Sequence, residues 1–151
     1  EMKEEIMDTA ADMPDTVIEE DMIEEMDTQE QQPEAPVLLS SGTFQGADSF
    51  HQGSGNAGLY QLSDQSHLLR LEDFSVTNGP DLRVLLVSHP NPSGRDDIQS
   101  GPYIELAKLK GNKGNQNYEI PENSDLNKYN KVLVWCKAFG VLFGSAELSS
   151  S

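Results

Sequence analysis

The sequence predicts an all-β fold, an antiparallel β-sandwich or barrel-like domain preceded by an acidic, largely disordered N-terminal segment. From Val37 onward, short runs of β-favouring residues alternate with clusters of Gly, Pro, Asn and Asp, which is typical of antiparallel sheets. Leu69 and Leu71 alternate with Arg70 and Glu72, as expected of a strand with one buried face. Upstream of Val37 there is no aromatic residue, so that segment has little to bury.

Turn-forming residues set the limits of the expected strands. Residues 63–66 predict a tight turn, residues 77–81 reverse the chain, and residues 110–115 form a Gly/Asn loop. Residues 89–102, with three prolines and two glycines, are expected to form a long connection. The eight strands predicted between these breaks span residues 37–45, 57–63, 66–74, 81–88, 103–109, 116–120, 131–138 and 141–148.

Charge divides the chain into two parts. Residues 1–36 hold 14 Asp/Glu against one Lys, a net charge of −13, and also contain all five methionines. We expect an acidic, Met-rich tether here, since such compositions are usually solvated, with a Met-rich metal or partner site as the alternative. Residues 37–151, with a net charge of −3, are expected to form the folded domain.

The folded part makes several classes of partner unexpected. It has no Lys/Arg-rich stripe of the kind that phosphate backbones require, so nucleic acid is not an expected partner. No apolar run approaches the roughly 18 residues of a membrane span. We therefore expect the protein to be either cytosolic, or exported or anchored by a segment that preceded Glu1, and membrane contact is expected only through such an N-terminal anchor.

Familiar site motifs are weak or misleading. Residues 53–58 spell G-x-G-x-x-G, but a strand rather than a helix is expected to follow, so nucleotide binding is not predicted. His51, His67 and His89 lack zinc-site spacing, although distant residues such as His51 and Cys136 could still meet in the fold. A Cys/His hydrolase is the least supported alternative, because Cys136 follows a β run rather than opening a helix.

The single cysteine is the most informative residue. Alternation along the strand places Val132, Val134 and Cys136 on one face, expected to face the core, whereas Trp135 lies on the other. A lone thiol forms no intramolecular disulfide, so four roles stay open for it. It is a buried hydrophobe, a ligand, a redox-active thiol or an intermolecular bridge.

A family resemblance rests on an ordered set of motifs. These are Gly42-Thr43-Phe44, Phe50-His51 with Gly53-Ser54-Gly55, Leu69 to Phe74, Gly79-Pro80-Asp81-Leu82, Leu106 to Gly111, Asn117 to Pro121, and Trp135-Cys136 with Phe139 to Leu148. Over about residues 41–148 the chain resembles the DM-thirteen domain, a β-rich module of extracellular and bacterial exported proteins. The Gly-Pro-Asp and Trp-Cys elements are the most specific.

The resemblance implies a function and a site. It implies an extracytoplasmic domain, exported or membrane-anchored and bacterial, with an electron-transfer role proposed for its cysteine, here Cys136. His51 falls on a characteristic histidine and is the candidate partner. Haem or a transition metal is the expected kind of cofactor, because a thiolate suits iron or copper, and a redox partner protein or cell-surface component is the expected partner. The supporting shell comprises Val134, Trp135, Phe139 and Asp81.

Besides the hydrolase, a second alternative to the redox role stays open. The domain is then a non-catalytic adhesion or interaction module, in which Cys136 only packs in the core. In neither interpretation is the domain expected to be an enzyme on its own. The geometry around Cys136, and whether His51 reaches it, separates the two.

Overall fold

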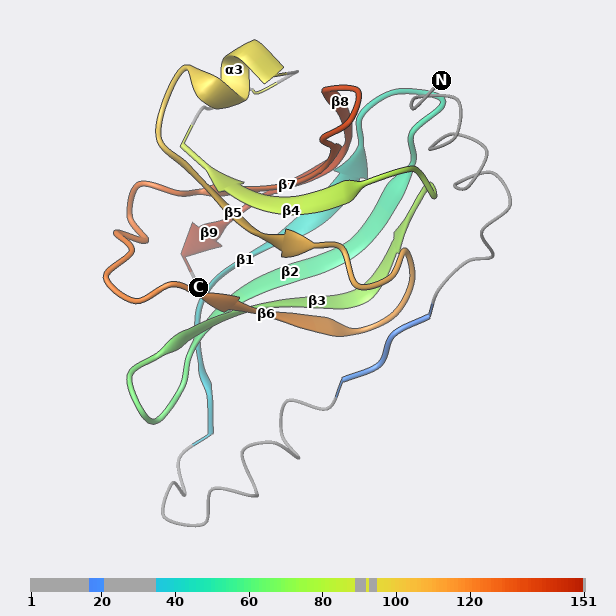
Figure 1. Cartoon of the computed structure of the whole chain (residues 1–151). Helices are drawn as coiled ribbons and strands as arrows, with labels where there is room; N and C mark the ends of the chain where they lie inside the picture. The colour runs from blue at the N-terminus through green and yellow to red at the C-terminus, as the bar shows by residue number, and fades with distance from the viewer. Residues whose placement is uncertain (1–16, 21–34, 89–91, 93–94, 151) are drawn as a thin grey trace.

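Antiparallel strands form a sheet that curls into a nearly closed barrel (Figure 1). The computed structural model describes residues 17–20, 35–88, 92 and 95–150. The elements are β1 (Val37–Gly46), β2 (Gly53–Gln61), β3 (His67–Val76), β4 (Leu82–Val87), α3 (Arg95–Gln99), β5 (Tyr103–Lys108), β6 (Gln116–Ile120), β7 (Lys131–Cys136), β8 (Val141–Glu147) and β9 (Ser149–Ser150).

The strand order is β5-β4-β7-β8-β1-β2-β3-β6, with β9 also paired to β1. Strand β1 joins the two halves, because its first residues pair with β2 whereas Phe44–Gly46 pair with β8. The end strands β5 and β6 contact each other across the remaining gap. The predicted antiparallel, barrel-like fold is therefore confirmed, and each of the eight predicted strands has its counterpart.

Three details differ from the sequence prediction. Strand β2 begins at Gly53, four residues early, and carries a bulge at Gly55, whose φ of 104° favours glycine. The G-x-G-x-x-G pattern thus lies within a strand that leads to another strand. The connection over 89–102 contains the five-residue helix α3, and the short strand β9 follows β8.

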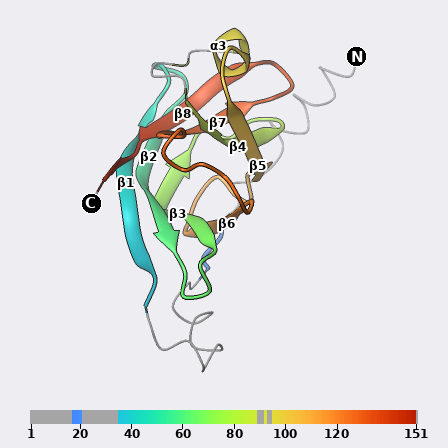
Figure 2. The ribbon, with the colours of Figure 1, turned by 90° about the vertical axis from the view of Figure 1, so that its left-hand side faces the viewer.

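Two apolar clusters lie on opposite faces of β7. Val132, Val134 and Cys136 point into the barrel interior, where they join the main core. Leu133 and Trp135 point outward but are covered by α3, whose Ile98 is buried. Figure 2 shows α3 above this side of the sheet. Full burial of each large apolar side chain stabilises the fold by about 1.5–3 kcal/mol.

A short piece of the N-terminal segment lies against the barrel. Val17 forms a parallel bridge to Lys113, in the loop before β6. The rest of the predicted tether lies outside the described residues. Its predicted disorder and the alternative of a Met-rich site therefore stay predictions. No helix in the described ranges is long and apolar enough to cross a membrane.

Candidate functional site around Cys136

Cys136 ends β7 and is fully buried, with an exposed fraction of 0%. It lies opposite Leu82 of β4 and Val141 of β8, so strands flank it on both sides. Its Sγ donates a hydrogen bond to the backbone carbonyl of Pro80, at 2.8 Å. The thiol therefore has a defined polar partner inside an otherwise apolar core.

Two turns enclose the sulfur. After Cys136 the chain reverses through residues 137–140, where Gly140 has a φ of 67° and donates its N–H to the Cys136 carbonyl at 2.8 Å. The opposite turn contains Asp81, at a φ of 55° that Asp tolerates better than most residues. The Lys137 N–H donates to the Asp81 carbonyl at 3.1 Å, which joins the two turns.

The surroundings keep the Cys136 thiol protonated. Burial raises the pKa of Cys136 above its ordinary value of 9.0, and the negative charge of Asp81 adds to that rise. Hydrogen bonds from the backbone amides of Phe139 and Ala138 to the sulfur act in the opposite direction on this pKa. At neutral pH the group is therefore a thiol, with two amides already directed at its sulfur.

His51 is held in the loop between β1 and β2. Its Nδ1 lies 2.8 Å from Asp48 Oδ1, which also accepts hydrogen bonds from the backbone amides of Phe50 and His51. The hydrogen bond from His51 is the main reason that the pKa of Asp48 lies below its ordinary value. The His51 ring packs against the Phe143 ring, with the ring centroids 4.3 Å apart.

Phe143 connects the histidine side of this region to the cysteine side. The Phe143 ring also lies against Gly79, where an added Cβ would come within 2.6 Å of ring atoms. Gly79 precedes Pro80, the acceptor for the Cys136 thiol. The structure thus brings His51 and Cys136 to the same end of the barrel, but no hydrogen bond in the described part of the chain joins them directly.

The predicted supporting shell is divided between two environments. Val134 shares the main core with Cys136, and Asp81 and Phe139 act on the thiol as described above. Trp135 instead lies in the outer cluster under α3, and its indole N–H has no hydrogen-bond partner within the described residues.

Sequence reasoning did not assign a site role to three residues that the structure places here. They are Gly79, Pro80 and Phe143, which come from two chain segments distant from each other in sequence. The only signals were the family motifs, Gly-Pro-Asp for the first two residues and Phe139 to Leu148 for Phe143, and neither motif indicated a contact between them.

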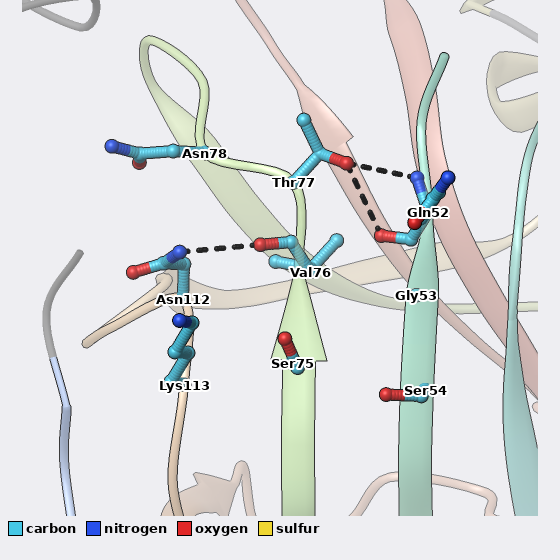
Figure 3. Close-up of a pocket in the computed structure, with 9 residues that line it drawn as sticks. All are labelled: Gln52, Gly53, Ser54, Ser75, Val76, Thr77, Asn78, Asn112 and Lys113. Carbon is cyan, nitrogen blue, oxygen red and sulfur yellow. Dashed lines mark hydrogen bonds between the residues drawn. The ribbon is translucent and has the colours of Figure 1, made fainter. Parts of the chain in front are cut away.

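A polar pocket of about 320 Å³ lies beside the Gln52 and Asn78 segments (Figure 3). Gln52 N–H donates to Thr77 Oγ1 at 2.9 Å, and Asn112 Nδ2 donates to the Val76 carbonyl at 3.3 Å. The wall is mostly hydroxyl and amide groups. Its lining residues are Gln52, Gly53, Ser54, Ser75, Val76, Thr77, Asn78, Asn112 and Lys113.

The donor set around Cys136 does not fit a resident haem or metal ion. Within the described ranges, no three His, Cys, Asp or Glu side chains gather to hold a metal. Cys136 Sγ donates a hydrogen bond to the Pro80 carbonyl, and the thiol has a raised pKa. Coordination requires a thiolate with an open side, so the two turns would have to separate first.

Comparison with known proteins adds one finding. The family described as Electron transfer DM13 matches residues 43–148, in agreement with the resemblance seen in the sequence. No curated protein and no solved structure matches the chain.

Proposed function

The chain belongs to the Electron transfer DM13 family, and from this premise we propose that it is an extracytoplasmic electron-transfer domain in which Cys136 is the redox residue. The observation that carries the proposal is the polar shell of the buried sulfur. One carbonyl accepts the thiol proton's hydrogen bond, and two amides point at the sulfur itself. Burial and hydrogen bonds to the sulfur change the pKa of a cysteine thiol and therefore its reactivity.

We propose a one-electron step at Cys136: the S–H bond breaks, one electron passes to an electron-accepting partner protein, the single Sγ proton is released, and the sulfur becomes a neutral thiyl radical. Return of one electron and one proton restores the thiol. Because that proton is directed at the Pro80 carbonyl, which is no base, it passes to water when the turns at 77–81 and 137–140 move apart. Amides of Ala138 and Phe139 then stabilise the sulfur as its proton leaves.

Protein-film voltammetry of the full chain tests this role. We expect a reversible redox wave in the wild-type protein that is absent from Cys136→Ser and Cys136→Ala, each checked for the native fold by circular dichroism. A wave that persists in both variants, or its absence from the wild type, refutes the Cys136-centred role. Parallel absorbance spectra after adding haem or Cu²⁺ show whether either group gives a new band that depends on Cys136.

The location outside the cytoplasm is tested separately. Cell fractionation of the source organism with an antibody against the domain should find the chain in the exported or membrane-attached fraction. Recovery in the cytosol alone contradicts the proposed location and removes a cell-surface component as its partner.

A second function is favoured by one observation, the complete burial of Cys136. In this alternative the domain is an adhesion or interaction module, and the cysteine only fills the core. Thiol-reagent kinetics separate the two proposals. A redox site predicts slow but measurable modification of the folded protein, whereas a structural cysteine reacts only after unfolding.

A further inference from the structure

The described N-terminal residues, 17–20, run alongside the loop before β6, and Val17 forms an isolated parallel bridge to Lys113 (blue in Figure 1). The Ile18 N–H donates to the Lys113 carbonyl at 2.8 Å, and the Glu20 N–H donates to the Asn115 carbonyl at 3.1 Å. Strand order ends at β6, directly after this loop, so this side of the sheet is an edge. Edge groups that are otherwise unpaired are natural sites for added strands.

Glu20 is contacted through both its side chain and its backbone. One carboxylate oxygen lies 2.7 Å from Lys110 Nζ, and the other accepts a hydrogen bond from the backbone N–H of Asn117. The Glu20 backbone carbonyl accepts a hydrogen bond from Arg70 Nη1 at 2.7 Å. Charge-assisted hydrogen bonds of this kind are about twice as strong as neutral ones.

The groups that contact Glu20 are positioned by the barrel itself. Lys110 donates its backbone N–H to Tyr118 Oη at 2.8 Å, and its ammonium group lies 5.4 Å from the centre of the Tyr118 ring. Arg70, only 7% exposed, also bonds to Glu72 at 3.0 Å and to Asn117 Oδ1 at 2.9 Å. Both cations are therefore oriented by partners other than Glu20.

Gly114 makes room for the backbone of residues 17–20. Its φ is +106°, and a Cβ at this position would lie 1.9 Å from the Ile18 carbonyl oxygen. Only glycine combines that conformation with so close an approach of another backbone. The loop thus fits an extended segment as well as a carboxylate.

The occupant and its site belong to different parts of the chain. Lys110, Arg70, Gly114 and Asn117 all lie within residues 43–148, which match the family, whereas residues 17–20 lie before them. We propose that this edge of the domain is a recognition site for an extended peptide bearing a glutamate, and that Val17–Glu20 is its built-in, displaceable occupant. Because segment and site share one chain, docking in cis has an effective concentration on the order of millimolar, and it competes with any peptide added in trans.

The test uses the full chain and a fluorescent peptide with the sequence of residues 15–22. Glu20→Lys removes the built-in carboxylate and repels Lys110, so this variant should bind the peptide about tenfold or more tightly than the wild type does. The matched control is Glu19→Lys, the same charge change at an exposed neighbouring position, which should bind like the wild type. Equal peptide binding by Glu20→Lys and the wild type overturns the proposal.

The site itself is tested in the Glu20→Lys background. Adding Lys110→Glu should abolish peptide binding, whereas Lys108→Glu on β5 should leave it unchanged. Hydrogen exchange supplies a readout without peptide. The backbone amides of residues 18 and 20 should be protected in the wild type and exposed in Glu20→Lys. They should be protected again in the double variant Glu20→Lys with Lys110→Glu, in which the two charges are exchanged. Peptide binding that survives Lys110→Glu, or amide protection that survives Glu20→Lys, overturns the proposal.

Discussion

The Phe143 ring lies against His51, with ring centroids 4.3 Å apart, and so connects the histidine loop to the turn that holds the Cys136 thiol. The two candidate residues are thus related through packing rather than through a direct hydrogen bond. Substitutions at His51 and at Gly79, which contact the Phe143 ring from its two sides, can report whether this connection has a functional role.

Wild-type stability should fall more steeply at high pH than that of Cys136→Ala. Burial raises the folded-state pKa of Cys136 above its ordinary value of 9.0, so the unfolded chain releases this proton first. The stability that the neutral thiol contributes is present in full below pH 9.0 and is lost as the pH rises through the folded-state pKa. Urea unfolding of both proteins between neutral and alkaline pH measures this difference.

The same comparison gives a second expected value. At neutral pH, Cys136→Ala should lower the free energy of unfolding by about 1–2 kcal/mol, because it leaves a small cavity in the core. Stability curves of the two proteins that run parallel across the alkaline range would contradict the raised pKa.

Asp81→Asn should lower the pKa of Cys136. The carboxylate of Asp81 raises this pKa by its charge, and Asn keeps the positive-φ backbone that the turn requires. Thiolate absorbance followed across alkaline pH measures the change. Glu105→Gln is the matched control, because Glu105, like Asp81, lies 2.7 Å from the Arg83 guanidinium but is not among the groups that shift the pKa of the thiol. An equal shift in both variants would show a nonspecific charge effect.

His51→Gln should raise the pKa of Asp48 toward 3.8, since the His51 side chain is the largest cause of its depression. Carboxyl carbon shifts in an NMR titration report the value. Asp64 is an internal control, because its lowered pKa comes from Ser66 and should not move. An unchanged Asp48 would mean that its two backbone hydrogen bonds, rather than the imidazole, hold its pKa down.

Gly79→Ala should destabilise the protein by about 1–3 kcal/mol, because the new Cβ forces the packed Phe143 ring to move. Gly53→Ala is the comparison, since a Cβ there meets its nearest atom at 3.5 Å, an ordinary contact. Thermal unfolding measures both, and the Gly53 variant should lie near the wild type. The His51 ring resonances should also shift in the Gly79 variant alone.

Alternation along the strands was sufficient to predict the sheet and the inward direction of Cys136. It could not predict α3, because five residues after a proline-rich stretch carry no helical period; Ile98 is held there by the outer face of β7. The carbonyl of Pro80 and the thiol of Cys136 lie 56 residues apart, so their hydrogen bond left no local signal.

The contact of Val17–Glu20 with the barrel could not be predicted from the sequence for a different reason. Acidic composition predicts average solvation, but it gives no weight to a single glutamate that contacts cations held in place by the fold. Lys110 and Arg70 come together only after β3 and β6 have paired. Composition alone therefore could not predict this contact, which depends on the fold.

The central place of β1 has a consequence for the order of events during biosynthesis. Its two lateral partners other than β2 are β8 and β9, the last strands described, so the sheet cannot be completed while residues 141–150 are still being synthesised. Pairings between distant parts of a chain also form slowly. A nascent chain therefore stays without the closing strands β8 and β9 until residues 141–150 have left the ribosome, so β1 waits without these partners for about a hundred residues of further synthesis.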